Sequence, residues 1–290
     1  MVFNMEFFLK LDNRFSDGKF VEDVVVEADR LGYHGFLMSD HYMWQTREPK
    51  DITTLETWVT LMYLAGKTEQ IRLGTQFTPI PFRQPAIFAK MLATLDVLSH
   101  GRVILGVGAG WSQAEFEGYS EWGSPRVRVD KTKEGIELML RLWTEGEVTF
   151  QGKYYQAERA VLEPKPVQKP YPTLFVSGRA GSYRMLRLAG RYGDLFNVTS
   201  RTANGEEVGQ EEVLKSRDYV FEVARNACRG DEVAYAMSLR RNQYDPKNYA
   251  DDIESAIGMG AKVLVTYFPR DDDYIENMRN FAKEIMPSYR

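Results

Sequence analysis

Short apolar runs alternate along the chain with longer stretches in which apolar residues recur every three or four positions. Such runs predict buried strands, and the longer spacing predicts amphipathic helices. The strands are predicted at 7–11, 36–38, 72–78, 102–107, 173–177, 194–198, 233–239 and 262–267. The helices are predicted at about 18–31, 54–66, 84–98, 129–143, 182–190, 207–228 and 274–286. About eight strand–helix units are the number in a TIM barrel, so we predict an α/β fold of the (β/α)8 type.

One region interrupts this alternation. Residues 147–172 contain a sequence typical of a small hairpin, followed by four closely spaced prolines, and we take this region as an excursion between barrel units. The length suits either one barrel of about 250 residues or two ordinary domains, and no linker-like composition favours two. We therefore predict a single domain over 1–290 with inserted segments. A doubly wound open sheet is the alternative, although it rarely needs so many parallel units.

Composition excludes several classes of function. The net charge is −4 with both signs interspersed, so nucleic acid is not an expected partner. No stretch is long and apolar enough to cross a membrane, and residues 1–10 lack a secretory signal, so we expect a soluble cytoplasmic protein without a membrane partner. The single cysteine, Cys228, allows no internal disulfide, and its neighbours predict a buried helix residue rather than a nucleophile.

The stretch 35–44 contains an apolar run that ends abruptly in ionisable and aromatic residues. Ser39, Asp40 and His41 would lie at the C-terminal end of a buried strand, which is where parallel α/β folds bind ligands. Alternatively, Asp40 caps the next segment and His41 is a core histidine with satisfied hydrogen bonds.

Two other strand ends should face the same opening. Residues 74–79 place polar and apolar side chains together at the end of the third strand. The glycines of 106–111, Gly-Val-Gly-Ala-Gly-Trp, would let a planar ligand approach the backbone closely. Their spacing does not match a dinucleotide-binding fingerprint, and glycines at a strand exit can also serve only to turn the chain.

Residues 176–182, Val-Ser-Gly-Arg-Ala-Gly-Ser, leave a strand and enter a helix. Free N–H groups and the positive dipole end of a helix, with serine hydroxyls and an arginine, predict a phosphate-binding loop. The cofactor-binding residues assigned here are Ser177, Gly178, Arg179, Gly181 and Ser182. A serine N-cap after a glycine turn would explain the same residues without a ligand.

Seven segments follow one another in a specific order and spacing, among them Gly-Phe-Leu-Met-Ser-Asp-His at 35–41 and Leu-Gly-Val-Gly-Ala-Gly-Trp at 105–111. The others are 71–75, 82–86, 93–102, 150–155 and 164–170. Together they span almost the whole chain and resemble the luciferase-like monooxygenase superfamily, especially its coenzyme F420-dependent oxidoreductases. No single segment is diagnostic.

The resemblance implies a luciferase-like TIM barrel that binds a deazaflavin or flavin at its C-terminal mouth, usually as a homodimer. It implies a non-proline cis peptide between Gln76 and Phe77 against the cofactor ring, near Gly108 and Gly110. It also implies that Asp40 and His41 form the active-site pair. Because histidine titrates near neutral pH, His41 is the candidate acid or base. Asp40 would either orient the imidazole or bind the cofactor ring.

One departure from the family pattern affects the expected substrate. Sugar-phosphate dehydrogenases of this branch place a glutamate directly after the glycine that corresponds to Gly110, whereas this chain has Trp111. We therefore do not expect a sugar-phosphate dehydrogenase. A small, partly hydrophobic substrate is expected instead, in a pocket lined by Tyr42, Trp44 and Trp111.

The predicted function is an oxidoreductase that transfers a hydride between F420 and this substrate. The first alternative is an FMN-dependent monooxygenase that uses separately reduced flavin and oxygen, and the second is a non-catalytic flavin-binding barrel. A metal-dependent hydrolase would need several ligands at different strand ends, but the three histidines are His34, His41 and His100, and only His41 lies at one. We therefore predict no metal site.

Overall fold

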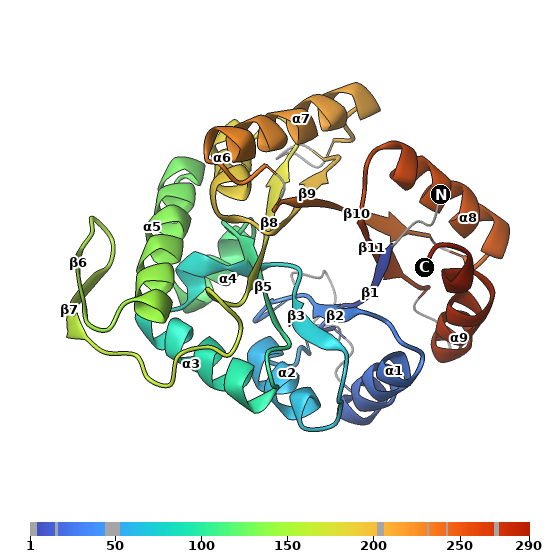
Figure 1. Cartoon of the computed structure of the whole chain (residues 1–290), viewed down its shortest axis with the longest axis horizontal. Helices are drawn as coiled ribbons and strands as arrows, with labels where there is room; N and C mark the ends of the chain where they lie inside the picture. The colour runs from blue at the N-terminus through green and yellow to red at the C-terminus, as the bar shows by residue number, and fades with distance from the viewer. Residues whose placement is uncertain are drawn as a thin grey trace.

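Eight parallel strands close into a barrel at the centre of the molecule (Figure 1). In the computed structural model the described residues are 5–14, 17–43, 53–201, 206–230, 232–241, 243–269 and 273–290. The barrel strands are β1 (Glu6–Leu11), β2 (Gly35–Met38), β3 (Arg72–Thr75), β5 (Val103–Gly108), β8 (Thr173–Arg179), β9 (Leu195–Thr199), β10 (Ala234–Arg240) and β11 (Val263–Tyr267). Pairing of β3 with β5 and of β1 with β11 closes the ring. The predicted (β/α)8 barrel is confirmed.

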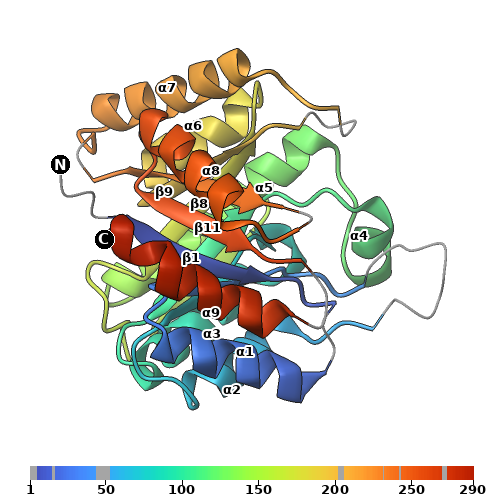
Figure 2. The same ribbon diagram turned by 90° about the vertical axis from the view of Figure 1, so that its right-hand side faces the viewer.

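Helices surround the barrel, as Figures 1 and 2 show. They are α1 (Gly18–Arg30), α2 (Thr57–Ala65), α3 (Pro85–Leu98), α5 (Pro125–Thr144), α6 (Tyr183–Tyr192), α7 (Gln210–Asn226), α8 (Pro246–Gly258) and α9 (Tyr274–Glu284). In α1, Asp17 accepts hydrogen bonds from the first-turn N–H groups, and Val21, Val24, Val25 and Ala28 form the buried face. No helix in the described part of the chain is long and apolar enough to cross a membrane.

Alternation along the strands divides the side chains between two layers. One apolar cluster fills the barrel interior, and its buried members are Phe8, Leu37, Ile104, Phe175, Leu195, Ala236, Val263 and Val265. Neighbouring strand residues such as Phe7 and Phe36 belong to the cluster that lies between strands and helices. Because side chains of a strand alternate between two faces, the residue two positions after each member of the interior cluster also points into the barrel. The polar side chains at these positions are Lys10, Ser39, Ser177, Asn197, Ser238 and Tyr267.

The structure differs from the sequence-based prediction in several places. The predicted strand 72–78 is broken after Thr75, and a short strand β4 (Thr78–Pro79) and 3-10 helix η2 (Ile80–Phe82) follow. Two helices, α4 (Gln113–Tyr119) and α8, were not predicted. The prediction for Cys228 was wrong: it is exposed and has a positive φ of 57°, just beyond the end of α7.

The predicted hairpin is present as β6 (Val148–Gln151) and β7 (Gln156–Ala160), which pair in a separate antiparallel sheet. It lies beside α5, outside the ring of barrel strands (Figure 1). A second 3-10 helix, η3 (Met286–Ser288), follows α9. In Figure 2, α4 lies beyond one end of the barrel strands. Because α4 follows β5 directly, that end is the C-terminal mouth.

Candidate active site

Asp40 is buried on the helix-facing side of the barrel wall. It continues the outward series of β2 after Phe36 and Met38, and its side chain is 1% exposed. Its carboxylate accepts two hydrogen bonds from Arg83, at 2.7 and 2.9 Å, so the two groups form a bidentate ion pair. Thr78 Oγ1 donates at 2.7 Å and Trp58 Nε1 at 3.2 Å. Asp40 therefore ties β2 to η2 and α2.

His41 is held by a different carboxylate. Its Nδ1 lies 2.9 Å from Oε2 of Glu115, a residue of α4 that is almost fully buried. The other carboxylate oxygen of Glu115 accepts the backbone N–H of Tyr42 at 2.5 Å and, more weakly, that of Met43 at 3.5 Å. Glu115 thus anchors both the imidazole and the backbone that carries it. A carboxylate at Nδ1 fixes the ring orientation and favours the tautomer with hydrogen on Nδ1.

Aromatic side chains gather on the α4 side of the mouth. Trp111 is 58% exposed, and its ring meets the His41 ring edge-on at 5.7 Å. Tyr42 packs instead between Phe82 and Tyr119, with the Arg83 guanidinium 5.0 Å from its ring centroid. Burial raises the pKa of the Tyr42 phenol to about 12. Trp44, the third predicted pocket residue, lies outside the described residues.

A polar network crosses the barrel just below the mouth. Lys10 Nζ donates to Ser39 Oγ at 2.6 Å and to the carbonyl oxygen of Gln76 at 3.0 Å, and Ser39 Oγ donates to Asp12 at 2.8 Å. Burial lowers the pKa of the Lys10 ammonium to about 8. Burial alone would raise the pKa of the Asp12 carboxyl, but Lys10 and Arg14 outweigh it and lower that pKa to about 2. The network therefore places ionisable groups close to the predicted active-site pair.

The peptide bond between Gln76 and Phe77 is cis, as the resemblance implied. The Gln76 side chain donates to Ser238 at 3.0 Å and accepts from Tyr267 at 2.7 Å, so it spans to β10 and β11. Phe77 contacts Phe175 of the interior cluster edge-on at 4.9 Å. The segment with the cis peptide therefore contacts β8, β10 and β11 at the barrel mouth.

The two glycines assigned to the cofactor have different surroundings. A Cβ at Gly108 would lie 3.3 Å from Cβ of Phe77, so Gly108 lies beside the cis peptide at the mouth. Gly110 has a φ of +81°, and a Cβ there would lie 2.3 Å from the Phe116 ring. The turn into α4 and the packing of Phe116 therefore already require glycine at position 110.

The predicted phosphate-binding loop has fewer available N–H groups than the sequence suggested. Gly181 N–H donates to Ser216 Oγ at 3.0 Å, and the N–H groups of Ser182 and Tyr183 donate to backbone carbonyls within the loop. Gly178 serves packing, because a Cβ there would lie 2.7 Å from the Leu186 side chain. The Ser182 hydroxyl makes no capping bond to α6. A ligand at this loop would therefore be bound mainly by side chains and not by backbone N–H groups.

Arg179 is the principal charged group of this loop. On β8 it shares the inward face with Phe175 and Ser177, so it is directed toward the mouth. Within the described residues its guanidinium has no carboxylate partner. Arg128 of α5 lies within electrostatic reach: burial lowers the pKa of its guanidinium, and the charge of Arg179 lowers it further. Two arginines close together make this side of the mouth positive.

Residues 5–239 match the sequence pattern of the luciferase-like monooxygenase family. The chain belongs to this family. A family member from Intrasporangium calvum, named F420-dependent glucose-6-phosphate dehydrogenase, is 35% identical over 201 residues, which are 68% of this chain and 58% of that protein. A protein of the same name from Beutenbergia cavernae is 32% identical over 83% of this chain and 68% of its own length. The match to the first relative thus spans a little over half of its length.

Solved structures of the family share the whole fold. An F420-dependent secondary alcohol dehydrogenase in complex with an F420–acetone adduct superimposes with a TM-score of 0.82 at 22% identity, covering 99% of both chains. The monooxygenase RslO1 from Streptomyces bottropensis gives a TM-score of 0.80 at 20% identity, over 99% of this chain and 100% of that one. At these identities the likeness shows the family's barrel fold and leaves the choice of reaction open.

The sequence pattern did not identify several residues of this site. Glu115 lies between the predicted strand 102–107 and the predicted helix 129–143, where no element was predicted. Lys10 is a charge within the apolar run Phe-Phe-Leu-Lys-Leu, and Arg83 ends the apolar run Pro-Ile-Pro-Phe. A charge inside an apolar segment is the signal that could have indicated these two buried cations.

Proposed function

We propose that this chain is an F420-dependent oxidoreductase in which His41 holds the proton that accompanies hydride transfer. The observation that carries the proposal is the arrangement of His41 between the buried Glu115 carboxylate and the exposed Trp111 ring. With Nδ1 committed to Glu115, Nε2 is the nitrogen on which a proton can be held or released. A hydride and a proton join or leave an organic substrate separately, so a positioned acid or base is needed.

The choice of cofactor rests on the relatives and on the fit of the mouth. The relatives reported above are named as F420-dependent enzymes, and one superimposed structure contains an F420 adduct. F420 supplies two electrons as a hydride when bound. The side chain of Arg179, with the Ser182 hydroxyl and the nearby charge of Arg128, suits the phosphate of such a cofactor. Phe77 and Gly108 lie side by side at the mouth, where a planar ring could approach them.

Within this proposal the residues of the site have different roles. Arg179, Ser177 and Ser182 bind the phosphate-bearing end of the cofactor, and Gln76, Phe77 and Gly108 contact its ring. His41 holds the proton, while Glu115 keeps the imidazole in place. Asp40 acts indirectly, because its carboxylate faces Arg83 and braces the strand that carries His41. Trp111 lines the substrate side, where its ring meets that of His41.

The substrate of the relatives is not carried over to this chain. Their matched regions cover only part of their length, and Trp111 beside His41 favours a small substrate with an apolar part. We further propose that the chain forms a homodimer and that it acts in the cytoplasm. Size-exclusion chromatography with light scattering can test the dimer directly.

The proposal is tested by titrating the purified chain with F420 and, separately, with FMN while following tryptophan fluorescence. Trp111 is the exposed tryptophan next to His41, so F420 binding should quench the emission, and Trp111→Phe should lose much of that quench. Tight FMN binding with weak F420 binding would contradict the proposal and favour the flavin monooxygenase alternative.

Arg179→Met supplies the residue-level test. It should weaken F420 binding about tenfold to a hundredfold, because a hydrogen bond to a charged group contributes roughly 1.5–3 kcal/mol. Arg187→Met removes the same charge from an exposed position on α6 and should leave the affinity unchanged. Equal affinities of the Arg179 and Arg187 variants would move the cofactor phosphate away from this loop.

A further inference from the structure

Arg240 is a cation at the barrel mouth that the proposed reaction does not yet use. It ends β10, where Ala236 belongs to the interior cluster and Ser238 bonds Gln76, so Arg240 continues the same inward series. Its guanidinium carbon lies 5.9 Å from the centroid of the Tyr267 ring. The side chain is exposed.

Two neighbouring arginines differ in their partners. Arg241 is bound to Asp252 by two hydrogen bonds, at 2.7 and 2.5 Å. In the described part of the chain Arg240 has no carboxylate within ion-pair distance and no hydrogen bond from its guanidinium. The charge of Arg241 is therefore balanced by a protein carboxylate, whereas no carboxylate among the described residues pairs with Arg240.

A cavity of about 460 Å³ surrounds this cation, lined by Arg240, Arg241, Gln243 and Asn248. The neighbouring carboxylate of Asp245 is already engaged, since it accepts the Lys247 N–H at the start of α8 and the Asn248 amide at 2.8 Å. The lining side chains are two guanidinium groups and two amides. Arg241 and the Asn248 amide already donate to Asp252 and Asp245, which leaves the Arg240 guanidinium and the Gln243 amide as donors to a ligand. Carboxylate and phosphate oxygens accept such bonds in bidentate fashion.

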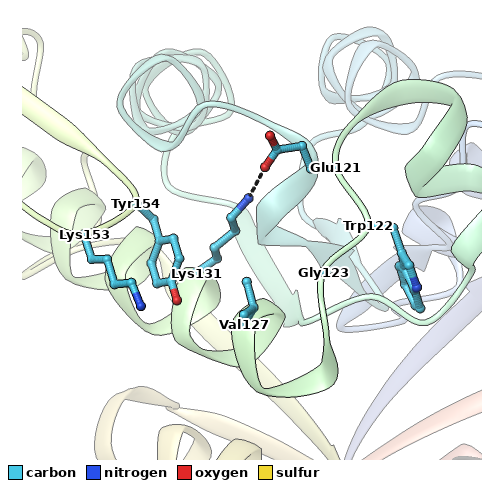
Figure 3. Close-up of a pocket in the computed structure, with 7 residues that line it drawn as sticks. All are labelled: Glu121, Trp122, Gly123, Val127, Lys131, Lys153 and Tyr154. Atoms are coloured by element: carbon cyan, nitrogen blue, oxygen red, sulfur yellow. Dashed lines mark hydrogen bonds and ion pairs between the residues drawn. The ribbon is translucent and has the colours of Figure 1, made fainter.

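A second cavity, of about 560 Å³, provides a contrast. It lies between the segment after α4 and the loop of the β6–β7 hairpin, and its lining residues are drawn in Figure 3. There the Lys131 ammonium is bonded to Glu121 at 2.9 Å, as the dashed line shows. None of the residues that line that cavity belongs to a barrel strand, and its Lys131 is already paired with a carboxylate.

The Arg240 cavity is connected to His41 through the polar network of the mouth. Tyr267, under the Arg240 guanidinium, donates to the Gln76 side chain, and the Gln76 carbonyl accepts from Lys10. Lys10 then bonds Ser39, two residues before His41. The charges of Arg240 and Arg14 act to lower the pKa of Lys10, and the carboxylates of Asp12 and Asp40 act to raise it.

We propose that the Arg240 cavity binds an oxyanion group of the substrate, a carboxylate or a phosphate, while the reacting carbon lies near His41. The inference rests on the proposed function, because it assigns the substrate class of that same site. Together with Trp111, it describes a substrate that is apolar near the reacting carbon and anionic at its far end. The cofactor phosphate occupies the Arg179 side, so the two anions have separate arginines.

The test uses isothermal titration calorimetry on the full chain saturated with F420, at constant ionic strength, with inorganic phosphate and separately with acetate. Saturation with F420 removes the Arg179 loop from competition. At least one of the two anions should bind, and Arg240→Met should weaken its binding about tenfold or more. Tighter phosphate binding indicates a phosphorylated substrate, and tighter acetate binding indicates a carboxylic acid.

Matched variants make the result specific. Lys153→Met, in the cavity of Figure 3, should leave anion binding unchanged, and Arg240→Lys should retain part of it because the charge remains. Binding of neither anion, or equal binding by the wild type and Arg240→Met, would overturn the inference. So would a loss of F420 affinity in Arg240→Met, since the anion would then belong to the cofactor. If F420 itself fails to bind, the proposed function fails separately, and the Arg240 comparison is made on the cofactor-free chain.

Discussion

The role given to Asp40 leads to a quantitative prediction for Asp40→Asn. The carboxylate is 1% exposed and its partner Arg83 is 11% exposed, so the pair is buried. Removing one partner of a buried pair costs about 3–5 kcal/mol. Here Arg83 keeps a second partner, Glu56, at 2.6 Å, so we take the lower end, about 3 kcal/mol. For a chain of this size that corresponds to a fall in Tm of about 5 °C.

Differential scanning calorimetry of four proteins checks this value: the wild type, Asp40→Asn, Arg83→Met and the double variant. The double variant should lose clearly less stability than the sum of the single variants, because the two groups interact directly. Asp23→Asn is the control, since its ion pair with Lys19 is exposed and screened by solvent, so its loss should leave the Tm almost unchanged. If Asp40→Asn keeps the wild-type Tm but binds F420 more weakly, Asp40 serves the cofactor and the structural role is wrong.

Three further predictions concern other parts of the site. Glu115→Ala should increase the fraction of His41 with hydrogen on Nε2, because the carboxylate that favours hydrogen on Nδ1 is removed. Nitrogen-15 NMR can follow this fraction, since the chain has only three histidines to assign. An unchanged tautomer ratio would show that Glu115 does not position the imidazole. The Asp12 carboxyl has a pKa of about 2 in the folded state against an ordinary value of 3.8, so its ionised form stabilises the fold by about 2 kcal/mol. That stabilisation is complete above pH 4 and is lost as the pH falls toward 2. The Tm difference between wild type and Asp12→Asn should therefore shrink over that range. Gly110→Ala should lower Tm by several degrees, because its Cβ would overlap the Phe116 ring, and a wild-type Tm would show that the turn can adjust.

The sequence predicted the barrel well because the signals are local and repeated. Strand and helix periodicity recurs along the chain, and each barrel unit buries its apolar face in the same way. Boundaries shifted where the chain turns at the mouth, as after Thr75, because the local hydrogen bonds there depend on residues far apart in sequence. The unpredicted helix α4 has only seven residues, which is too short for a clear periodic pattern. Helix α8 was missed although Asp245 caps it and Tyr249, Ile253 and Ala256 are buried at helical spacing.

The site was predicted only in part, for a related reason. The position of His41 follows from a strand end, but its partner Glu115 is 74 residues away and no local pattern relates the two. Asp40 and His41 were treated as an active-site pair because the family resemblance implied it. In a strand adjacent residues point to opposite faces, so adjacency in sequence separates them in space. The same alternation places Arg240 on the inward face of β10, four residues after Ala236. This position follows from the sequence only when the bounds of β10 are known.

A crystal structure of the chain with F420 is the most direct test of the central claim. The account predicts that the deazaflavin ring lies at the barrel mouth against Phe77 and Gly108, within reach of His41, with the cofactor phosphate bonded to Arg179 and with Arg240 left without a cofactor contact. A ring bound elsewhere, or a phosphate held by Arg240 instead of Arg179, would contradict it.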